Sequence, residues 1–195
     1  MSSQKKAFKK GICWIRRDIR LHDHYALSQA CAHCDEVDLV FVFDPLILNK
    51  VLDMAHQLAP QDFDDSGLLP DGRIEFLLEG ISNLQSKLEE FGGTLLVRHG
   101  NPNDVIPHLL QETKAEALFF NRDYEPYAKK RDKDVTQQLE KQGFSVLTFK
   151  DQVIYEEQEI VKPKGDPYKV FTPYKNRWLE TFQEQWEGGI LPSYN

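Results

Sequence analysis

The side chains of this chain that are best suited to hold a ligand lie in the six-residue segment Asn121–Pro126. The segment offers an amide, a guanidinium, a phenol and two carboxylates, and it follows an apolar run, residues 117–120, that is typical of a buried strand. The fixed backbone of Pro126 suits the first position of a helix, and the helical pattern continues to Gln142. The segment therefore falls at the carboxyl end of a predicted parallel strand, where open α/β sheets bind their ligands.

The surrounding pattern alternates strands and helices, which predicts the fold class α/β, with a Rossmann-like five-stranded parallel sheet and helices on both faces. Apolar runs predict strands at residues 11–16, 37–43, 94–98, 117–120 and 144–149. The first helix is predicted to begin at His24 with Asp23 as its N-cap, and the second to span 73–91 before Gly92. The third is predicted to begin at Pro102 after the cap residue Asn101, with a kink at Pro107. The fourth is predicted to run from Tyr127 towards Gly143. The long, acidic connection over residues 44–72 is typical of a functional or mobile segment.

The chain divides into three predicted parts. Residues 1–10 carry four lysines and are expected to form a basic flexible tail, residues 11–150 hold the sheet domain, and residues 151–195 hold an irregular segment and a helix that starts at Thr172-Pro173. Apolar rings on a terminal helix need a covering surface, which is either the sheet domain or a partner outside this chain. The residues on that face are Trp178, Leu179, Phe182 and Trp186.

The composition is that of a globular domain. Of 195 residues, 41% are hydrophobic and 28% are charged, and no apolar run approaches the roughly 18 residues that span a membrane. The net charge of −7 matters because DNA binding depends on lysine and arginine neutralising phosphates. The chain can hold a local basic patch, but we do not expect it to grip a DNA duplex alone.

Three cysteines are too few for a disulfide framework, and they fit a reducing, cytoplasmic location. Cys31 and Cys34 form a C-x-x-C pair of the kind found in zinc and redox sites. Both fall with Leu27 and Ala30 at helical spacing on an apolar stripe. We therefore interpret the two thiols as small core residues.

Known phosphate-binding and hydrolytic motifs are missing. The turn after the first strand is Arg16-Arg17-Asp18 rather than a glycine-rich phosphate loop, and the chain has no G-x-G-x-x-G, no P-loop and no G-x-S-x-G elbow. Asp18 can bridge neighbouring guanidinium groups, which favours an ion-paired turn over direct ligand contact by Arg16. His22 and His24 flank an aspartate that suits capping better than metal binding. We therefore predict a binding domain with no catalytic residues and no metal site.

Three segments, in this order and spacing, resemble the amino-terminal domain of the DNA photolyase/cryptochrome family. They are Trp14-Ile15-Arg16-Arg17-Asp18-Ile19-Arg20-Leu21-His22-Asp23, Asn121-Arg122-Asp123-Tyr124-Glu125-Pro126 with Arg131-Asp132, and Pro167-Tyr168-Lys169-Val170-Phe171-Thr172-Pro173-Tyr174. The similarity runs from about Gly11 to Trp186. The chain departs from the family pattern conservatively at Ile15 and Ile19, and at His24, where the family usually has Asn. The last change bears on local hydrogen bonding rather than on the fold.

The resemblance implies a binding site. The second segment lies where many relatives hold an antenna chromophore, a reduced folate or a deazaflavin, and an Asn amide with a Glu carboxylate can satisfy the donors and acceptors of such a ring edge. The residues implied to bind this cofactor are Asn121, Glu125, Asp123, Tyr124, Arg16 and Asp44. The structural alternative is that Asn121 only fixes the loop and Glu125 only caps the next helix.

The resemblance also implies what lies outside this chain. A carboxyl-terminal domain would bind FAD, dock damaged DNA and split cyclobutane pyrimidine dimers with an electron from the light-excited flavin. The full-length protein would then be a DNA photolyase, a carbon–carbon lyase, and this fragment alone would be inactive. We expect a monomer without membrane contact, whose partners are that domain and, through it, DNA. Two alternatives stay open: a cryptochrome-type photoreceptor domain, or a stand-alone α/β module that binds a nucleotide-like ligand or a protein partner through the Trp178/Phe182/Trp186 face.

Overall fold

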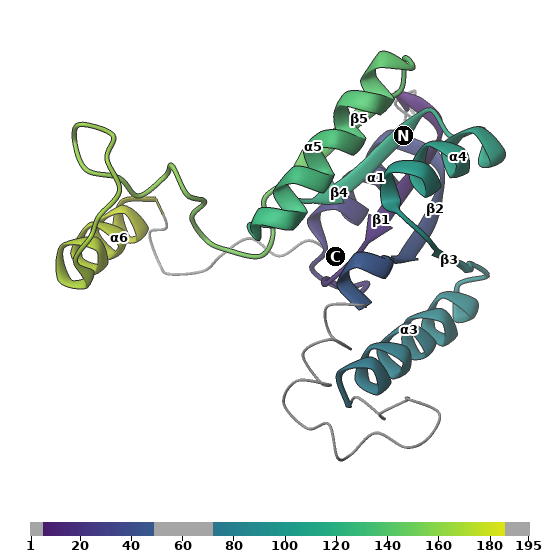
Figure 1. Ribbon diagram of the computed structural model, residues 1–195, viewed down its shortest axis with the longest axis horizontal. Helices are drawn as coiled ribbons and strands as arrows, with labels where there is room; N and C mark the ends of the chain where they lie inside the picture. The colour runs from purple at the N-terminus through teal and green to yellow at the C-terminus, as the bar shows by residue number, and fades with distance from the viewer. Residues whose placement is uncertain (1–5, 49–71, 186–195) are drawn as a thin grey trace, which may run out of the picture.

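Five parallel strands form the centre of the molecule, which a computed structural model describes for residues 6–48 and 72–185 (Figure 1). They lie in the order β3-β2-β1-β4-β5, and all neighbouring strands pair in parallel. The predicted Rossmann-like sheet is therefore confirmed. The strands are β1 (Phe8–Ile15), β2 (Cys34–Phe43), β3 (Leu95–His99), β4 (Ala117–Asn121) and β5 (Ser145–Phe149).

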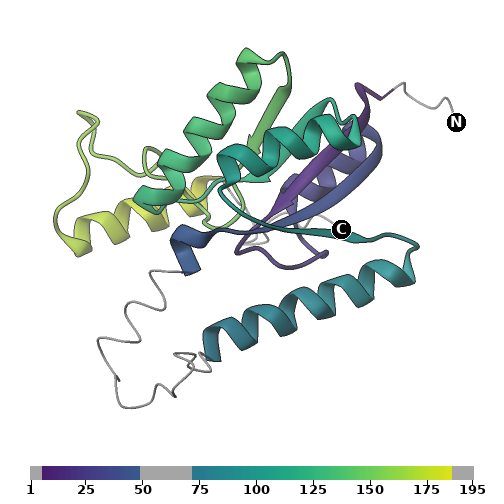
Figure 2. The same cartoon turned by 45° about the vertical axis from the view of Figure 1, so that its right-hand side comes forward.

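Helices cover both faces of this sheet because its central strands are apolar on both sides. Cys13, Ile15 and Phe119 face the core under α1 and α3, whereas Trp14 and Phe120 face the core under α4 and α5. Figure 2 shows α4 and α5 next to each other over the strands. Alternate residues of one strand thus enter separate cores, as the two-residue repeat requires. The four helices are α1 (Tyr25–His33), α3 (Gly72–Glu90), α4 (Pro102–Thr113) and α5 (Pro126–Lys141).

Most sequence signals for helix ends are confirmed. Asn101 caps α4 by accepting a hydrogen bond from the Asn103 N–H at 3.0 Å, and Pro126 is the first residue of α5. α3 ends before Gly92, which has a left-handed φ of 74°. α4 continues through the buried Pro107, and the kink expected there stays a prediction.

The predicted cap of α1 is wrong. His24, not Asp23, takes the extended N-cap conformation, and its Nδ1 accepts from the Leu27 N–H at 3.1 Å. Asp23 instead lies in a turn with a positive φ of 51°, so its backbone cannot serve as the cap. The imidazole here does what a shorter polar side chain does at most N-caps.

Two further boundaries differ from the prediction. α1 ends at His33, so Cys34 is the buried first residue of β2, and Cys31 is exposed at the end of the helix. Only one of the two thiols is therefore a core residue. β1 begins at Phe8, which packs edge-on against Phe119 with ring centroids 6.2 Å apart, so residues 8–10 belong to the sheet rather than to a tail. Most of the long connection predicted over 44–72 lies outside the described residues.

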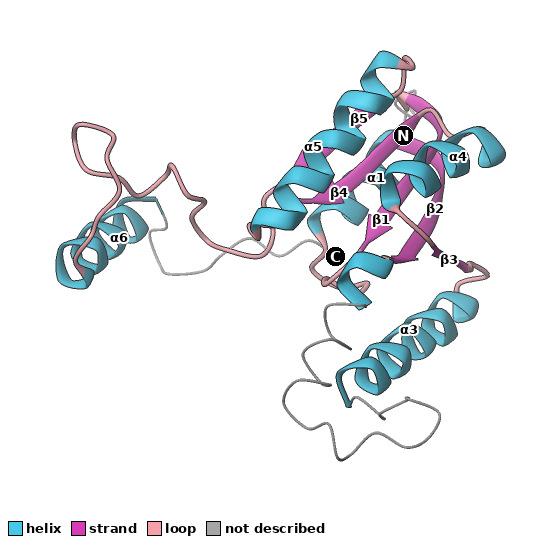
Figure 3. Ribbon diagram, in the orientation of Figure 1, coloured by secondary structure: helices cyan, strands magenta, loops and turns pink. Residues whose placement is uncertain are grey.

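The chain after β5 forms a long loop, residues 150–170, followed by α6 (Phe171–Gln185) (Figure 3). Trp178 on α6 stacks on Phe182 with ring centroids 5.2 Å apart and meets the Tyr155 ring of the loop edge-on at 5.5 Å. This part of the predicted aromatic face is therefore packed against the loop. Trp186 lies outside the described residues.

Gly11 marks a very close approach in the core, because a Cβ there would lie 2.5 Å from Cys34 Sγ and 3.0 Å from the Phe119 ring. We predict that Gly11→Ala lowers the free energy of unfolding by about 1–3 kcal/mol, the usual cost of overpacking a filled core. Gly80→Ala in α3 is the matched control: its new methyl would approach only Ile19, at 3.8 Å, and should stabilise the helix by roughly 0.5–1 kcal/mol. Urea unfolding measures both, and shifts of the same sign would contradict this packing.

Candidate functional site

A buried polar cluster joins the carboxyl ends of β1 and β4. The Asp18 carboxylate is 4% exposed; it accepts from the Arg16 backbone N–H at 2.9 Å and from the Asn121 amide at 2.8 Å, and it lies 2.9 Å from His24 Nε2. The amide oxygen of Asn121 accepts in turn from the Ala26 N–H at 3.0 Å. One carboxylate and one amide thus hold two strands and the start of α1 together.

These contacts define the protonation of the cluster. Because His24 Nδ1 accepts from the Leu27 N–H, we assign the ring proton to Nε2, which donates it to Asp18. Burial alone would raise the pKa of Asp18, but the hydrogen bonds from His24 and from the Arg16 N–H hold that pKa well below its usual range. Asp18 is therefore a buried anion surrounded by donors.

A second buried cluster lies on the other face of the sheet. The Arg16 guanidinium donates to Asp132 at 2.6 Å and to the Asn121 carbonyl, and it lies 4.8 Å from the centre of the Trp14 ring. Arg131 donates to the other oxygen of Asp132 at 2.8 Å and also lies over Trp14, at 4.9 Å. The Arg16 guanidinium therefore already has hydrogen-bond partners within the protein.

Asp44 follows β2 and links it to α5. Its carboxylate accepts from the Leu46 N–H at 3.0 Å and from the Tyr127 hydroxyl. Burial, together with this hydrogen bond, raises the pKa of Tyr127 to about 12, so the phenol keeps the proton that it donates. Asp44 thus also has its partners inside the protein.

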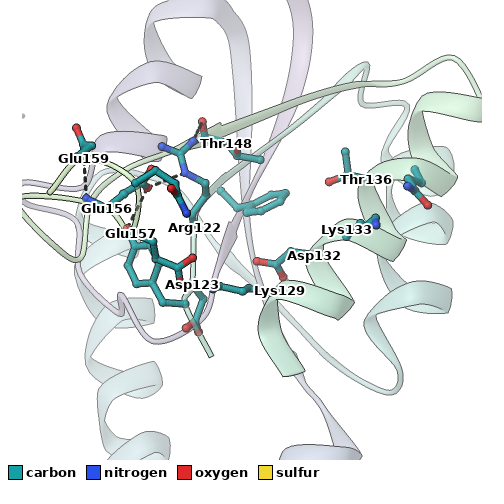
Figure 4. A pocket seen from close by; sticks show the side chains of 14 residues that line it. Arg122, Asp123, Lys129, Asp132, Lys133, Thr136, Thr148, Glu156, Glu157 and Glu159 are labelled. Atoms are coloured by element: carbon teal, nitrogen blue, oxygen red, sulfur yellow. Dashed lines mark hydrogen bonds and ion pairs between the residues drawn. The ribbon is translucent and has the colours of Figure 1, made fainter. Parts of the chain in front are cut away.

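A pocket of about 590 Å³ opens at the carboxyl ends of β4 and β5, between α5 and the loop that follows β5 (Figure 4). Its volume is within the range of sites for small organic ligands. Phe120 and Asp132 border both this pocket and Arg16. The other main lining residues are Arg122, Asp123 and Tyr124 after β4, Lys133, Thr136 and Gln137 on α5, and residues 156–159 of the loop.

Arg122 and Tyr124 organise the loop side of the pocket. Arg122 donates through Nε to Glu156 at 2.7 Å and through a terminal nitrogen to the Thr148 carbonyl at 2.8 Å, and the Tyr124 hydroxyl donates to the same Glu156 oxygen at 3.0 Å. Burial, and then the bond to Glu156, raises the pKa of Tyr124, so the phenol stays a donor at neutral pH. Figure 4 shows Thr136 on α5 across the pocket from Arg122.

The alternation of β4 decides which side chains reach this pocket. Phe119 packs under α1, and Asn121, two residues later, points to the same side and bonds to the Ala26 N–H. Phe120 and Arg122 point to the opposite side and line the pocket. A ligand could reach the fully buried Asn121 amide only by displacing its present partners.

Two of the six predicted ligand contacts, Asp123 and Tyr124, line the pocket. Glu125 occupies the N-cap position of α5 without a side-chain cap hydrogen bond; its exposed carboxylate instead pairs with Arg17 at 2.7 Å. The predicted contacts that do not line the pocket are Asn121, Glu125, Arg16 and Asp44.

Several residues that line the pocket were not predicted from the sequence to lie at a binding site. Lys133 and Gln137 are four residues apart on α5, the helix that begins directly after the binding segment, so helical spacing could have indicated them. Residues 156–159 belong to a loop without periodicity, and no signal in the sequence places them beside α5.

For metal clusters, membrane helices and reactive thiols, the structure describes only part of the chain. Within residues 6–48 and 72–185, no three His, Cys, Asp or Glu side chains come together in a way that could hold a metal ion. In the same ranges, no helix is both long and apolar enough to cross a membrane. Burial raises the pKa of Cys34 to about 11, so this thiol is not a reactive thiolate at neutral pH.

Comparison with known proteins identifies the family. The DNA photolyase profile matches residues 11–192, and the chain belongs to the DNA photolyase family. It is 32% identical over 165 residues to the deoxyribodipyrimidine photo-lyase of a Synechococcus species, which covers 85% of this chain and 31% of that protein. It is 29% identical over 190 residues to cryptochrome-2 of Arabidopsis thaliana, which covers 96% of this chain and 28% of that protein.

The fold comparison agrees. A class III photolyase from Agrobacterium tumefaciens superposes with a TM-score of 0.68 at 30% identity, over 88% of this chain and 31% of that one. The chain thus spans about a third of the length of the relatives that it matches.

The buried Asp18 anion makes the fold sensitive to acid. Its pKa is lowered in the folded state, so the stabilisation is complete above the ordinary aspartate pKa of about 3.9 and is lost as the pH falls below that value. Asp18→Asn removes the anion that three donors share, and we expect the free energy of unfolding at neutral pH to fall by about 3–5 kcal/mol. The variant should also lose part of the acid dependence of the parent chain.

The matched control for this prediction is Asp134→Asn, which removes a carboxylate that pairs on the surface with Lys130 one turn earlier on α5. It should cost less than about 0.5 kcal/mol. Urea unfolding at several pH values between roughly 3 and 7 measures both variants. The contrary outcome is that Asp18→Asn proves as stable as the control, or that its stability depends on acid as the parent's does. Either result would show that Asp18 is not a buried, stabilising anion.

Proposed function

We propose that this chain is the antenna domain of a DNA photolyase and that the pocket beside β4 and β5 binds its light-harvesting chromophore, a reduced folate. The observation that carries this proposal is the place of the pocket. It lies at the strand ends of a photolyase-family domain and is lined by Asp123 and Tyr124 of the binding segment.

The charges of the lining suit the two ends of a reduced folate. A pterin ring presents N–H donors, and the buried Asp123 and the half-buried Glu156 offer carboxylate acceptors beside the apolar ring of Phe120. The glutamate tail of a folate is anionic, and the exposed Lys133 on α5 offers an ammonium group to it, whereas Lys129 already pairs with Glu157. Lys133 therefore favours a folate over a deazaflavin, which is the alternative chromophore.

The predicted contacts outside the pocket enter this proposal as positioning residues. The Glu125 N–H donates to Asp123 at 3.2 Å, and Arg17 lies 3.6 Å from Asp123 while it pairs with the Glu125 carboxylate. Glu125 and Arg17 therefore orient Asp123. Asn121 and Arg16 fix the end of β4, from which the segment starts.

The family supports a proposal for the reaction of the full-length protein. Excitation of the antenna would pass to FAD bound outside this chain, and the reduced flavin would donate an electron to a cyclobutane pyrimidine dimer in DNA. The name of the Synechococcus relative, deoxyribodipyrimidine photo-lyase, supports this reading. The three free cysteines of the present chain also support a cytoplasmic location.

A cryptochrome-type photoreceptor is the second candidate, because the Arabidopsis relative that aligns with 96% of this chain is named a cryptochrome. Both candidates would use the same antenna pocket. Repair of dimer-containing DNA by the full-length protein under blue light distinguishes them, since only a photolyase should restore the pyrimidines.

Chromophore uptake tests the pocket directly. Titration of the chain with 5,10-methenyltetrahydrofolate, a reduced folate that absorbs in the near-UV, should give saturable binding in equilibrium dialysis. Thr136→Trp places an indole among the lining side chains, so we expect it to weaken binding by about tenfold or more, equivalent to ~1.4 kcal/mol.

Glu140→Trp is the control, because it adds the same ring one turn further along α5, at an exposed residue that does not line the pocket. It should bind the folate as the unmutated chain does, and unfolding curves verify that both variants fold. Binding that Thr136→Trp leaves unchanged would put the chromophore elsewhere. A chain that binds neither the folate nor a deazaflavin would not be an antenna domain.

A further inference from the structure

Basic residues outnumber acidic ones in a stretch near the end of this acidic chain. Between residues 161 and 177 the sequence has five lysines and arginines and only one carboxylate, Asp166, whereas the whole chain has a net charge of −7. The residues just before this stretch, 156–159, include three glutamates that border the pocket beside β4 and β5 that we propose binds folate, the folate pocket. The change of sign along one loop separates a cationic surface from the acidic remainder. The five basic residues are Lys162, Lys164, Lys169, Lys175 and Arg177.

Three of these residues line a second pocket of about 410 Å³, the lysine pocket. Lys162, Lys164 and Lys169 line it together with Tyr168 and Asp166. Across residues 6–48 and 72–185, the three ammonium groups form no ion pair or hydrogen bond. The residues that line this pocket therefore include three lysines without a partner among the described residues and one carboxylate, which gives the lining a net positive charge.

The loop that carries these lysines is held by its own backbone. The Lys162 N–H donates to the Asp166 carbonyl at 2.9 Å, and the Gly165 N–H donates to the Lys162 carbonyl at 2.8 Å. Gly165 has a φ of 85°, which lets the turn close. The turn contains both Lys162 and Lys164, and both line the same pocket as Tyr168.

Aromatic residues alternate with the basic ones in this stretch of the sequence. Tyr168 meets Tyr174 edge-on with ring centroids 6.3 Å apart, and Phe171 is largely exposed between them in the sequence. Lysines interleaved with aromatic rings suit a nucleic-acid strand, because the ammonium groups attract phosphates and a ring can stack on any base.

We infer that the lysine pocket binds the phosphate backbone of a DNA strand. The choice of DNA among polyanions rests on the proposed function, whereas the site lies apart from the folate pocket and shares no residue with it. Part of the grip on DNA then comes from this chain, although its net charge opposes binding elsewhere on its surface. The loop leads directly into α6, so it can present the strand next to the rest of the protein.

Salt-dependent binding of the full chain to a fluorescein-labelled oligothymidylate tests this inference. Anisotropy titrations over roughly 20–200 mM salt give the affinity and the slope of its logarithm against that of the salt concentration. The variant carries Lys162→Gln, Lys164→Gln and Lys169→Gln together. We expect its affinity at the lowest salt to fall by about tenfold or more and its slope to decrease by about 2, near 0.7 for each phosphate contact on a single strand.

The control carries Lys87→Gln, Lys114→Gln and Lys141→Gln, three exposed lysines on other surfaces, and thus has the same net charge. It should retain the affinity and the slope of the unmutated chain. Equal weakening by both variants would reveal a diffuse charge effect and overturn the inference, as would the absence of binding by the unmutated chain at the lowest salt. Loss of binding to phosphatidylserine vesicles without loss of DNA binding would overturn it too. Folate uptake by the lysine variant, measured separately, keeps this result distinct from a failure of the antenna proposal.

Discussion

Burial of the Asp18 charge is the constraint on which the rest of this domain depends. A carboxylate removed from water costs several kcal/mol unless donors surround it. The donors here come from three elements: the Arg16 N–H at the end of β1, the Asn121 amide at the end of β4, and the His24 imidazole at the start of α1. The charge is stable only while β1, β4 and α1 keep these positions. These elements surround the point between β1 and β4 where the strand order of the sheet reverses. Their polar groups there bond to one another through Asp18.

The chain that follows β5 is fixed to the same region and forms one wall of the pocket. Asp151, whose side chain is nearly buried, accepts from the Tyr25 N–H at 3.0 Å and pairs with Arg20 at 2.5 Å, which ties the start of the loop to α1. Five residues further on, Glu156 accepts from Arg122 and Tyr124. The pocket therefore lies between strand ends, a helix and a loop with two anchors, an arrangement that can hold a planar ligand with defined orientation.

The sequence predicted the architecture well because buried parallel strands are short continuous apolar runs, and helices show their period in any amphipathic stretch. It failed at α1, where the cap depends on the φ of Asp23, a property of the tertiary turn. It drew attention to a segment that borders the pocket, and two of its six predicted ligand contacts, Asp123 and Tyr124, line that pocket. In β4 alternate residues face opposite layers, so Asn121 turns into the core while Arg122 turns to the pocket. The other wall, residues 156–159, could not be predicted, since its place results from long-range contacts of an irregular loop.

Backbone amide chemical shifts of the isotopically labelled chain, recorded with and without 5,10-methenyltetrahydrofolate, test most directly whether the ligand occupies this pocket. If the folate occupies the pocket, the largest changes should fall on Arg122, Tyr124, Thr136 and Gln137, with Ala26 and Leu27 at the buried cluster nearly unchanged. Changes centred on Ala26, Leu27 and Asp44, with the pocket residues unaffected, would contradict this expectation and place the ligand at the reversal point of the sheet instead.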